Sequence, residues 1–218
     1  MFQWTEKFQA HQDWITLSII LIFILSVYLY KRNTHQFKLL IYFWNSKNYF
    51  KIYEKEKFTN PSNPFNLILT LITLITFSLL AYFFYEKILM SLLGEISFLD
   101  FFIVISAVVV VRYVILKLIC QLSDLLELFQ QTVFRSVSFY AMISLYAIFL
   151  FSIYHYRFFT NSTLFFIISL MVICAVYLSH LTIYIRIIRI TPNNIVYLIL
   201  YLCVFKIAPW LWLYKSIY

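Results

Sequence analysis

Long apolar runs alternate with short polar connections along the chain. Six of these runs are long enough to cross a bilayer, because about 17–25 helical residues span a hydrocarbon core of about 30 Å. They are residues 14–30, 65–85, 101–120, 137–154, 163–185 and 195–214. The pattern predicts an all-α, polytopic membrane helix bundle of about six transmembrane helices, which forms a single integral membrane domain over residues 1–218.

The longest hydrophilic stretch, residues 31–64, follows the first predicted span and contains seven basic residues. Within it, apolar side chains recur at the i, i+3, i+4 and i+7 spacing of one helix face: Phe37, Leu40, Ile41 and Trp44. Because lysines lie beside this stripe, we expect an amphipathic helix in the headgroup layer of the cytoplasmic face. The prolines at residues 61 and 64 then end the segment, since each disfavours a helical conformation in the residue before it.

The third predicted span carries Arg112 and Lys117, and its helical periodicity continues beyond residue 120. An apolar line follows the pattern onward at Leu118, Leu122, Leu125 and Phe129. This line predicts an extended third helix over residues 101–134, about 50 Å long, that tilts, bends or projects into the cytoplasm.

The net charge of +8, from 17 Lys and Arg against 9 Asp and Glu, is concentrated in the connections between the runs. With six spans, residues 31–64, 118–136 and 186–194 lie on one side with ten basic residues, and the other side has four. Basic loops stay in the cytoplasm, so both termini are expected in the periplasm. A nucleic-acid partner is not expected, because no basic stripe is separate from the membrane segments.

Composition also limits the possible chemistry. The chain has one glycine, Gly94, which excludes glycine-rich phosphate loops and dinucleotide fingerprints. No two histidines have a ligand spacing, and His180 within the fifth run is expected to be a hydrogen-bonded packing residue. The three cysteines lie in or beside apolar runs and resemble small hydrophobic residues. We therefore expect no catalytic residues, cofactor or metal, and no enzymatic activity.

Lys206 lies in the middle of the sixth run. A charge near the bilayer centre costs about 2.5–3.5 kcal/mol on insertion scales, so it should have a partner or reach an interface. Asp124 and Glu127 are the candidate partners if the third helix packs near the sixth, and Arg112 and Lys117 belong to the same set of candidate buried charges. Snorkelling of Lys206 and a role in transport or proton relay are the alternatives.

Pro209 removes a backbone hydrogen bond and is expected to kink the sixth helix. A kink beside a charge is found at some transporter substrate sites. No second half of the chain repeats the pattern, however, so a structural kink is the preferred interpretation.

The end of the sixth run, from Leu198 to Pro209 with Leu213-Tyr214-Lys215, resembles the end of domain-of-unknown-function family 4271, integral membrane proteins of Bacteroidota. Asp13-Trp14, Phe37, and Lys117 with Phe129 also agree with that pattern, which covers nearly the whole chain. In the family pattern an acidic residue usually stands at the position of Lys206, which argues against a proton relay that depends on the sign of this charge. The resemblance implies a bacterial inner membrane and brings no known activity.

The small size and aromatic-rich surface favour a non-catalytic subunit or scaffold of an inner-membrane complex. Its partners would be the lipid bilayer and other membrane proteins. The resemblance to Bacteroidota proteins suggests the secretion and gliding machinery as that complex. A small transporter or channel is the first alternative, and a membrane enzyme acting on lipid substrates is the second.

Overall fold

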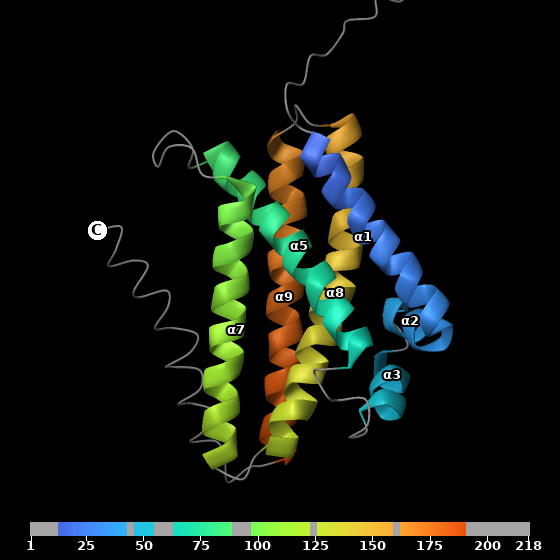
Figure 1. Cartoon of the computed structure of the whole chain (residues 1–218), viewed down its shortest axis with the longest axis vertical. Coiled ribbons are helices and arrows are strands. Elements are labelled where there is room, and N and C mark those ends of the chain that lie inside the picture. Colours follow the sequence, from blue (N-terminus) through green and yellow to red (C-terminus); the bar gives the residue numbers. More distant parts are fainter. Residues whose placement is uncertain are drawn as a thin grey trace, which may run out of the picture.

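The computed structural model describes residues 13–42, 46–54, 63–88, 97–122, 126–158 and 162–190. Every regular element in these ranges is a helix, which confirms the all-α prediction (Figure 1). The helices are α1 (Asp13–Arg32), α2 (Thr34–Ile41), α3 (Ser46–Tyr53), α5 (Pro64–Ile88), α7 (Phe98–Leu122), α8 (Leu126–Arg157) and α9 (Ser162–Ile190).

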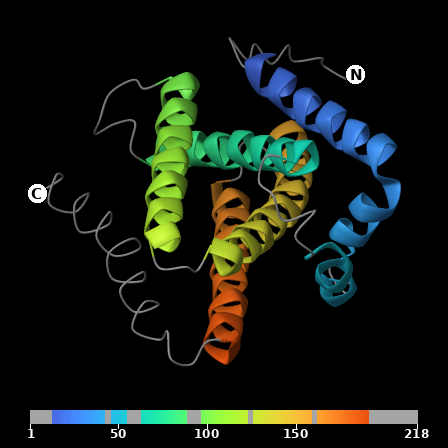
Figure 2. The same cartoon turned by 60° about the horizontal axis from the view of Figure 1, so that its bottom comes forward.

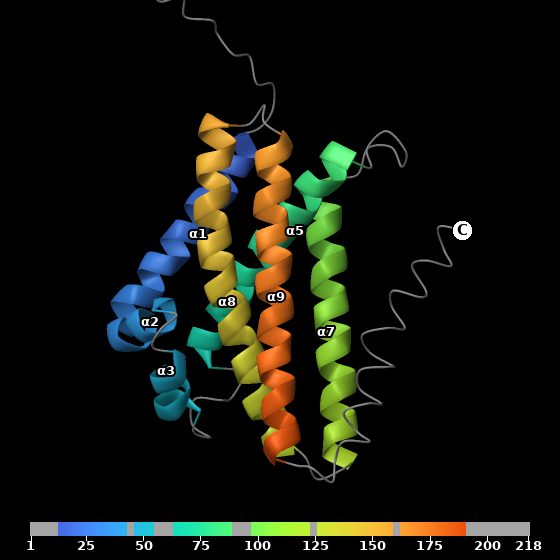
Figure 3. The same cartoon turned by 180° about the vertical axis from the view of Figure 1, so that it is seen from behind.

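Five of the described helices, α1, α5, α7, α8 and α9, are long and apolar enough to cross a membrane. They cover the first five apolar runs and run alternately in opposite directions (Figures 1 and 3). The chain is therefore a multi-pass membrane helix protein. The sixth run, residues 195–214, lies outside the described residues.

The core lies where α5 and α8 cross, with α1 packed on α5 and α9 packed on α8 (Figure 2). Several small residues along α8 are buried: Ser138, Ala141, Ser144 and Ala147. Short side chains let helix backbones approach closely, which is how membrane helices associate without a hydrophobic driving force between them. Larger side chains such as Phe83 and Phe151, whose ring centroids are 4.8 Å apart, fill the remaining space.

The prediction of an extended third helix over residues 101–134 is wrong. α7 ends at Leu122, and α8 begins at Leu126 and runs back in the opposite direction. The ring of Phe129 lies 5.6 Å from that of Tyr113, although one straight helix would separate them by about 24 Å. Each arm of a helical hairpin has the same 3.6-residue period as a continuous helix, so the apolar spacing did not reveal the reversal.

The stripe on residues 37–44 also differs from the expectation. Phe37 and Leu40 are buried at 5% and 3% exposure and belong to the main hydrophobic core, with Ile41 partly buried beside them. The chain itself covers the apolar face that was expected to lie in lipid headgroups. Trp44 lies outside the described residues.

Candidate functional site: a charged cluster between three helices

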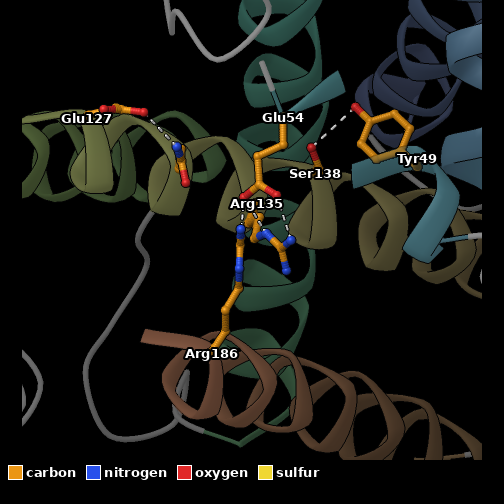
Figure 4. Close-up of polar contacts among 7 residues, drawn as sticks. Tyr49, Glu54, Glu127, Arg135, Ser138 and Arg186 are labelled. Carbon is orange, nitrogen blue, oxygen red and sulfur yellow. Dashed lines mark hydrogen bonds and ion pairs between the residues drawn. The ribbon is translucent and has the colours of Figure 1, made fainter. Parts of the chain in front are cut away.

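Glu54, Arg135 and Arg186 form a charged cluster, which we call the Glu54 cluster (Figure 4). Glu54 directly follows α3, Arg135 lies in α8, and Arg186 lies near the end of α9. Arg135 donates from Nε to Oε1 of Glu54 at 2.6 Å and from Nη2 to Oε2 at 2.7 Å. Arg186 donates from Nη1 to the same Oε1. One carboxylate thus holds three helices together.

An aromatic surface fixes the Arg135 side chain. Its guanidinium carbon lies 4.5 Å from the ring centroid of Phe50, one turn before Glu54 on α3. Phe134 stacks on Tyr49 at 5.9 Å between ring centroids, and the Tyr49 hydroxyl lies 3.4 Å from Ser138 Oγ. These contacts hold α3 against α8, which positions Glu54 for the two-bond contact with Arg135.

Burial and charge act in opposite directions on Glu54. Burial raises the pKa of its carboxyl, but hydrogen bonds from Arg135 and Arg186 and their positive charges together outweigh burial, so the pKa lies below its usual range. The carboxylate therefore stays ionised at neutral pH and does not serve as a proton donor there. Burial raises the pKa of Tyr49 to about 12, so its phenol stays neutral.

The Glu54 cluster lies toward the end of the bundle where α8 begins and α9 ends. Arg135 and Arg157 are separated by 22 residues of α8, about 33 Å of helix. This length is comparable to a hydrocarbon core of about 30 Å. α1 ends in Lys31 and Arg32 on the side of Arg135, next to α2 and α3 (Figure 1).

The structure describes three of the charged residues singled out in the sequence, namely Glu127, Lys117 and Arg112. Glu127 is exposed and accepts a hydrogen bond from Gln131 Nε2 at 3.2 Å within α8. Lys117 is exposed and Arg112 is half-buried, both on α7. Asp124, Lys206 and Pro209 lie outside the described residues, so the pairing of Lys206 and the kink at Pro209 stay predictions.

Sequence reasoning missed the Glu54 cluster. Glu54 lies among lysines in a hydrophilic stretch, and Arg135 and Arg186 border apolar runs, where basic residues commonly mark the cytoplasmic side. Each arginine therefore had an ordinary explanation. The residues are 81 and 132 positions from Glu54, and nothing in their spacing indicates contact.

A second polar contact joins α8 and α9 within the membrane-spanning part. The hydroxyl of Tyr140 forms a hydrogen bond with Nε2 of His180, and the Tyr184 ring stacks on His180 at 6.1 Å between centroids. His180 is thus a hydrogen-bonded packing residue, as predicted. At the other end of the bundle, Lys87 of α5 bonds the hydroxyl of Tyr154.

No group of three or more His, Cys, Asp and Glu residues among the described ranges could hold a metal ion. Among the described contacts, the Glu54 cluster, the Tyr140–His180 contact and the Lys87–Tyr154 contact each link different helices.

A family model for a domain of unknown function, DUF4271, matches residues 8–217. No curated protein and no solved structure gives a significant match to the chain.

Proposed function

The chain belongs to the family of the domain of unknown function DUF4271, and we propose that it is a non-catalytic subunit or scaffold of a larger membrane complex. The complex would lie in the bacterial inner membrane, and the secretion and gliding machinery is the candidate that the sequence suggests. The observation that carries this proposal is the pairing of Glu54 with two arginines of other helices. Two arginines from two spanning helices donate three hydrogen bonds to its carboxylate, so the ion pairs link these helices to the end of α3.

Hydroxyl side chains within the spans support an architectural role. Many donate to the backbone carbonyl three or four residues earlier in their own helix, so these hydroxyls have a hydrogen-bond acceptor without needing one on another helix. Examples are Ser26, Thr70, Thr73, Thr76, Ser144, Ser152 and Thr182. A polar transport path would instead need side chains that present these groups to a solute.

The charge distribution supports one orientation in the membrane. The end with α2 and α3 carries Lys31, Arg32, Arg135 and Arg186, and basic residues favour the cytoplasmic face. The opposite end, where α1 begins, would then be periplasmic. With a sixth span over residues 195–214, both termini would lie in the periplasm.

Co-purification tests the proposal. The full chain would be tagged, extracted from native membranes in mild detergent and separated by size exclusion, with a tagged membrane protein of similar abundance as control. We expect membrane proteins to co-elute with the chain in a constant molar ratio and to be missing from the control, as quantified by mass spectrometry.

Two results would contradict a scaffold role. One is a chain that elutes alone and supports solute flux after reconstitution into vesicles, which would indicate a transporter or channel. The other is a chain that elutes alone and converts added membrane lipids to new products, which would indicate a lipid enzyme.

A further inference from the structure

The Glu54 cluster has more positive than negative charge. Two guanidinium groups face one carboxylate, which leaves a net charge of +1 in a partly buried position. The side chains of Arg135 and Arg186 are only 19% and 29% exposed, and a desolvated excess charge is unfavourable unless another ion neutralises it. The cluster therefore favours an additional anion.

Hydrogen-bond donors for such an anion remain. An arginine side chain has five N–H donors in a fixed plane. Arg135 uses two nitrogens on Glu54, and Arg186 uses one. Within the described ranges no other acceptor bonds to either guanidinium, so Arg186 in particular keeps most of its donors.

The position of Arg186 limits the kind of anion. Arg186 lies 24 residues after Ser162 on α9, about 36 Å of helix, and therefore near the membrane surface on the side of α3. The preceding residue, Ile185, is 51% exposed on the outside of the bundle, where lipid chains would lie. The Arg186 side chain is itself partly exposed, so its guanidinium lies at the edge of the cluster, at the level expected for headgroup phosphates.

We propose that the Glu54 cluster binds the phosphate of one anionic phospholipid in the leaflet next to α3. Arg186 supplies most of the donors, Arg135 adds its remaining N–H groups, and Glu54 acts as a positioning residue. Guanidinium groups match phosphate oxygens in pairs, and one phosphodiester charge brings the sum at the cluster to zero. This inference does not depend on the scaffold proposal.

The rival explanation is general attraction of anionic lipid to a basic membrane surface, which needs no particular site. Arg32 provides a matched control. It is an exposed arginine at the end of α1 on the same side of the bundle, and its Nη1 donates to the Tyr28 hydroxyl at 3.4 Å, within its own helix. Arg32→Gln removes the same charge from the same surface but leaves the cluster intact.

The test is a titration of the full-length protein in neutral detergent with phosphatidylglycerol, phosphatidylcholine or inorganic phosphate. The thermal unfolding midpoint measures binding, and native mass spectrometry counts retained lipids. We expect phosphatidylglycerol to raise the midpoint and to be retained as one tightly bound lipid. Phosphatidylcholine, with no net charge, should do neither. Arg186→Gln should weaken phosphatidylglycerol binding about tenfold, the loss of one charged contact, and Arg32→Gln should leave it within about twofold.

Arg186→Lys guards against a folding artefact, since it keeps the charge and can still reach Glu54 but loses the planar pair of donors. An intermediate loss of affinity supports the proposal. Equal affinity in wild-type, Arg186→Gln and Arg186→Lys proteins overturns it, as does an equal loss in Arg32→Gln. Competition by inorganic phosphate at the same concentration as the lipid would identify a free-anion site and overturn the assignment to a lipid.

Discussion

Arg135 binds both carboxylate oxygens of Glu54, at 2.6 Å and 2.7 Å, although 81 residues separate them in the sequence. The contact joins the short helix α3 to the long spanning helix α8, and Arg186 extends it to α9. Arg135 also covers the ring of Phe50, so its loss would remove packing as well as charge. The fold on this side of the bundle thus depends strongly on one arginine.

Replacement of Arg135 is expected to destabilise the protein. Arg135→Gln removes a two-bond charged contact and leaves Glu54 with Arg186 alone, which should cost about 1.5–3 kcal/mol. Arg157→Gln, an exposed arginine at the other end of the same helix, should change stability by less than about 0.5 kcal/mol. Thermal unfolding in detergent compares the two variants.

A double-mutant cycle with Glu54→Gln separates the pair from the packing on Phe50. If Arg135→Gln is as harmful in the Glu54→Gln background as in wild type, the two residues are not coupled and the ion pair is not the source of stability.

Acid should weaken the Glu54 cluster in a defined pH range. The folded-state pKa of Glu54 lies below its ordinary value of 4.5, so its stabilising effect is complete above pH 4.5 and is lost as pH falls through the folded pKa. The stability difference between wild type and Glu54→Gln should therefore shrink below pH 4.5. Unfolding midpoints measured at intervals from pH 7 to pH 3 check this. A difference that is constant over the whole range would show that the carboxylate is not the group involved.

Because Leu40 is buried in the core, its truncation should lower the free energy of unfolding more than truncation of a lipid-facing residue would. Leu40→Ala should lower the free energy of unfolding by about 2–5 kcal/mol, because it removes a side chain from the core. Ile52→Ala, at a position 43% exposed on α3, is the matched control and should have a small effect. Chemical unfolding in detergent measures both. Equal, small effects would place the stripe of α2 outside the core.

The proposed orientation predicts which residues are accessible from the periplasm. The three native cysteines would first be replaced. Lys51→Cys or Arg157→Cys, at two exposed positions, would then provide a single cysteine. In spheroplasts, a membrane-impermeant maleimide should label Arg157→Cys, and it should label Lys51→Cys only after the membrane is opened. The reverse pattern would invert the topology.

The sequence by itself determined the all-α membrane class and the positions of the five described spans. A bilayer offers the backbone no hydrogen-bond partners, so a long apolar run has few alternatives to a helix, and this constraint is local and readable from composition. The buried small residues on α8 also follow from local spacing. The hydrogen-bonded role of His180 followed from the high cost of an unsatisfied polar group in the membrane.

Only the tertiary structure decided which helices pack together and which charges meet. Each arm of a helical hairpin has the same 3.6-residue period as a straight helix, so the reversal between Leu122 and Leu126 was recognised only from the structure, where Tyr113 contacts Phe129. The stripe with Phe37 and Leu40 suits lipid and protein equally well, since both are apolar, and its position against the core depends on the path of the chain. Glu54 meets Arg135 and Arg186 because α3, α8 and α9 converge there, and no spacing within the sequence encodes such long-range contacts.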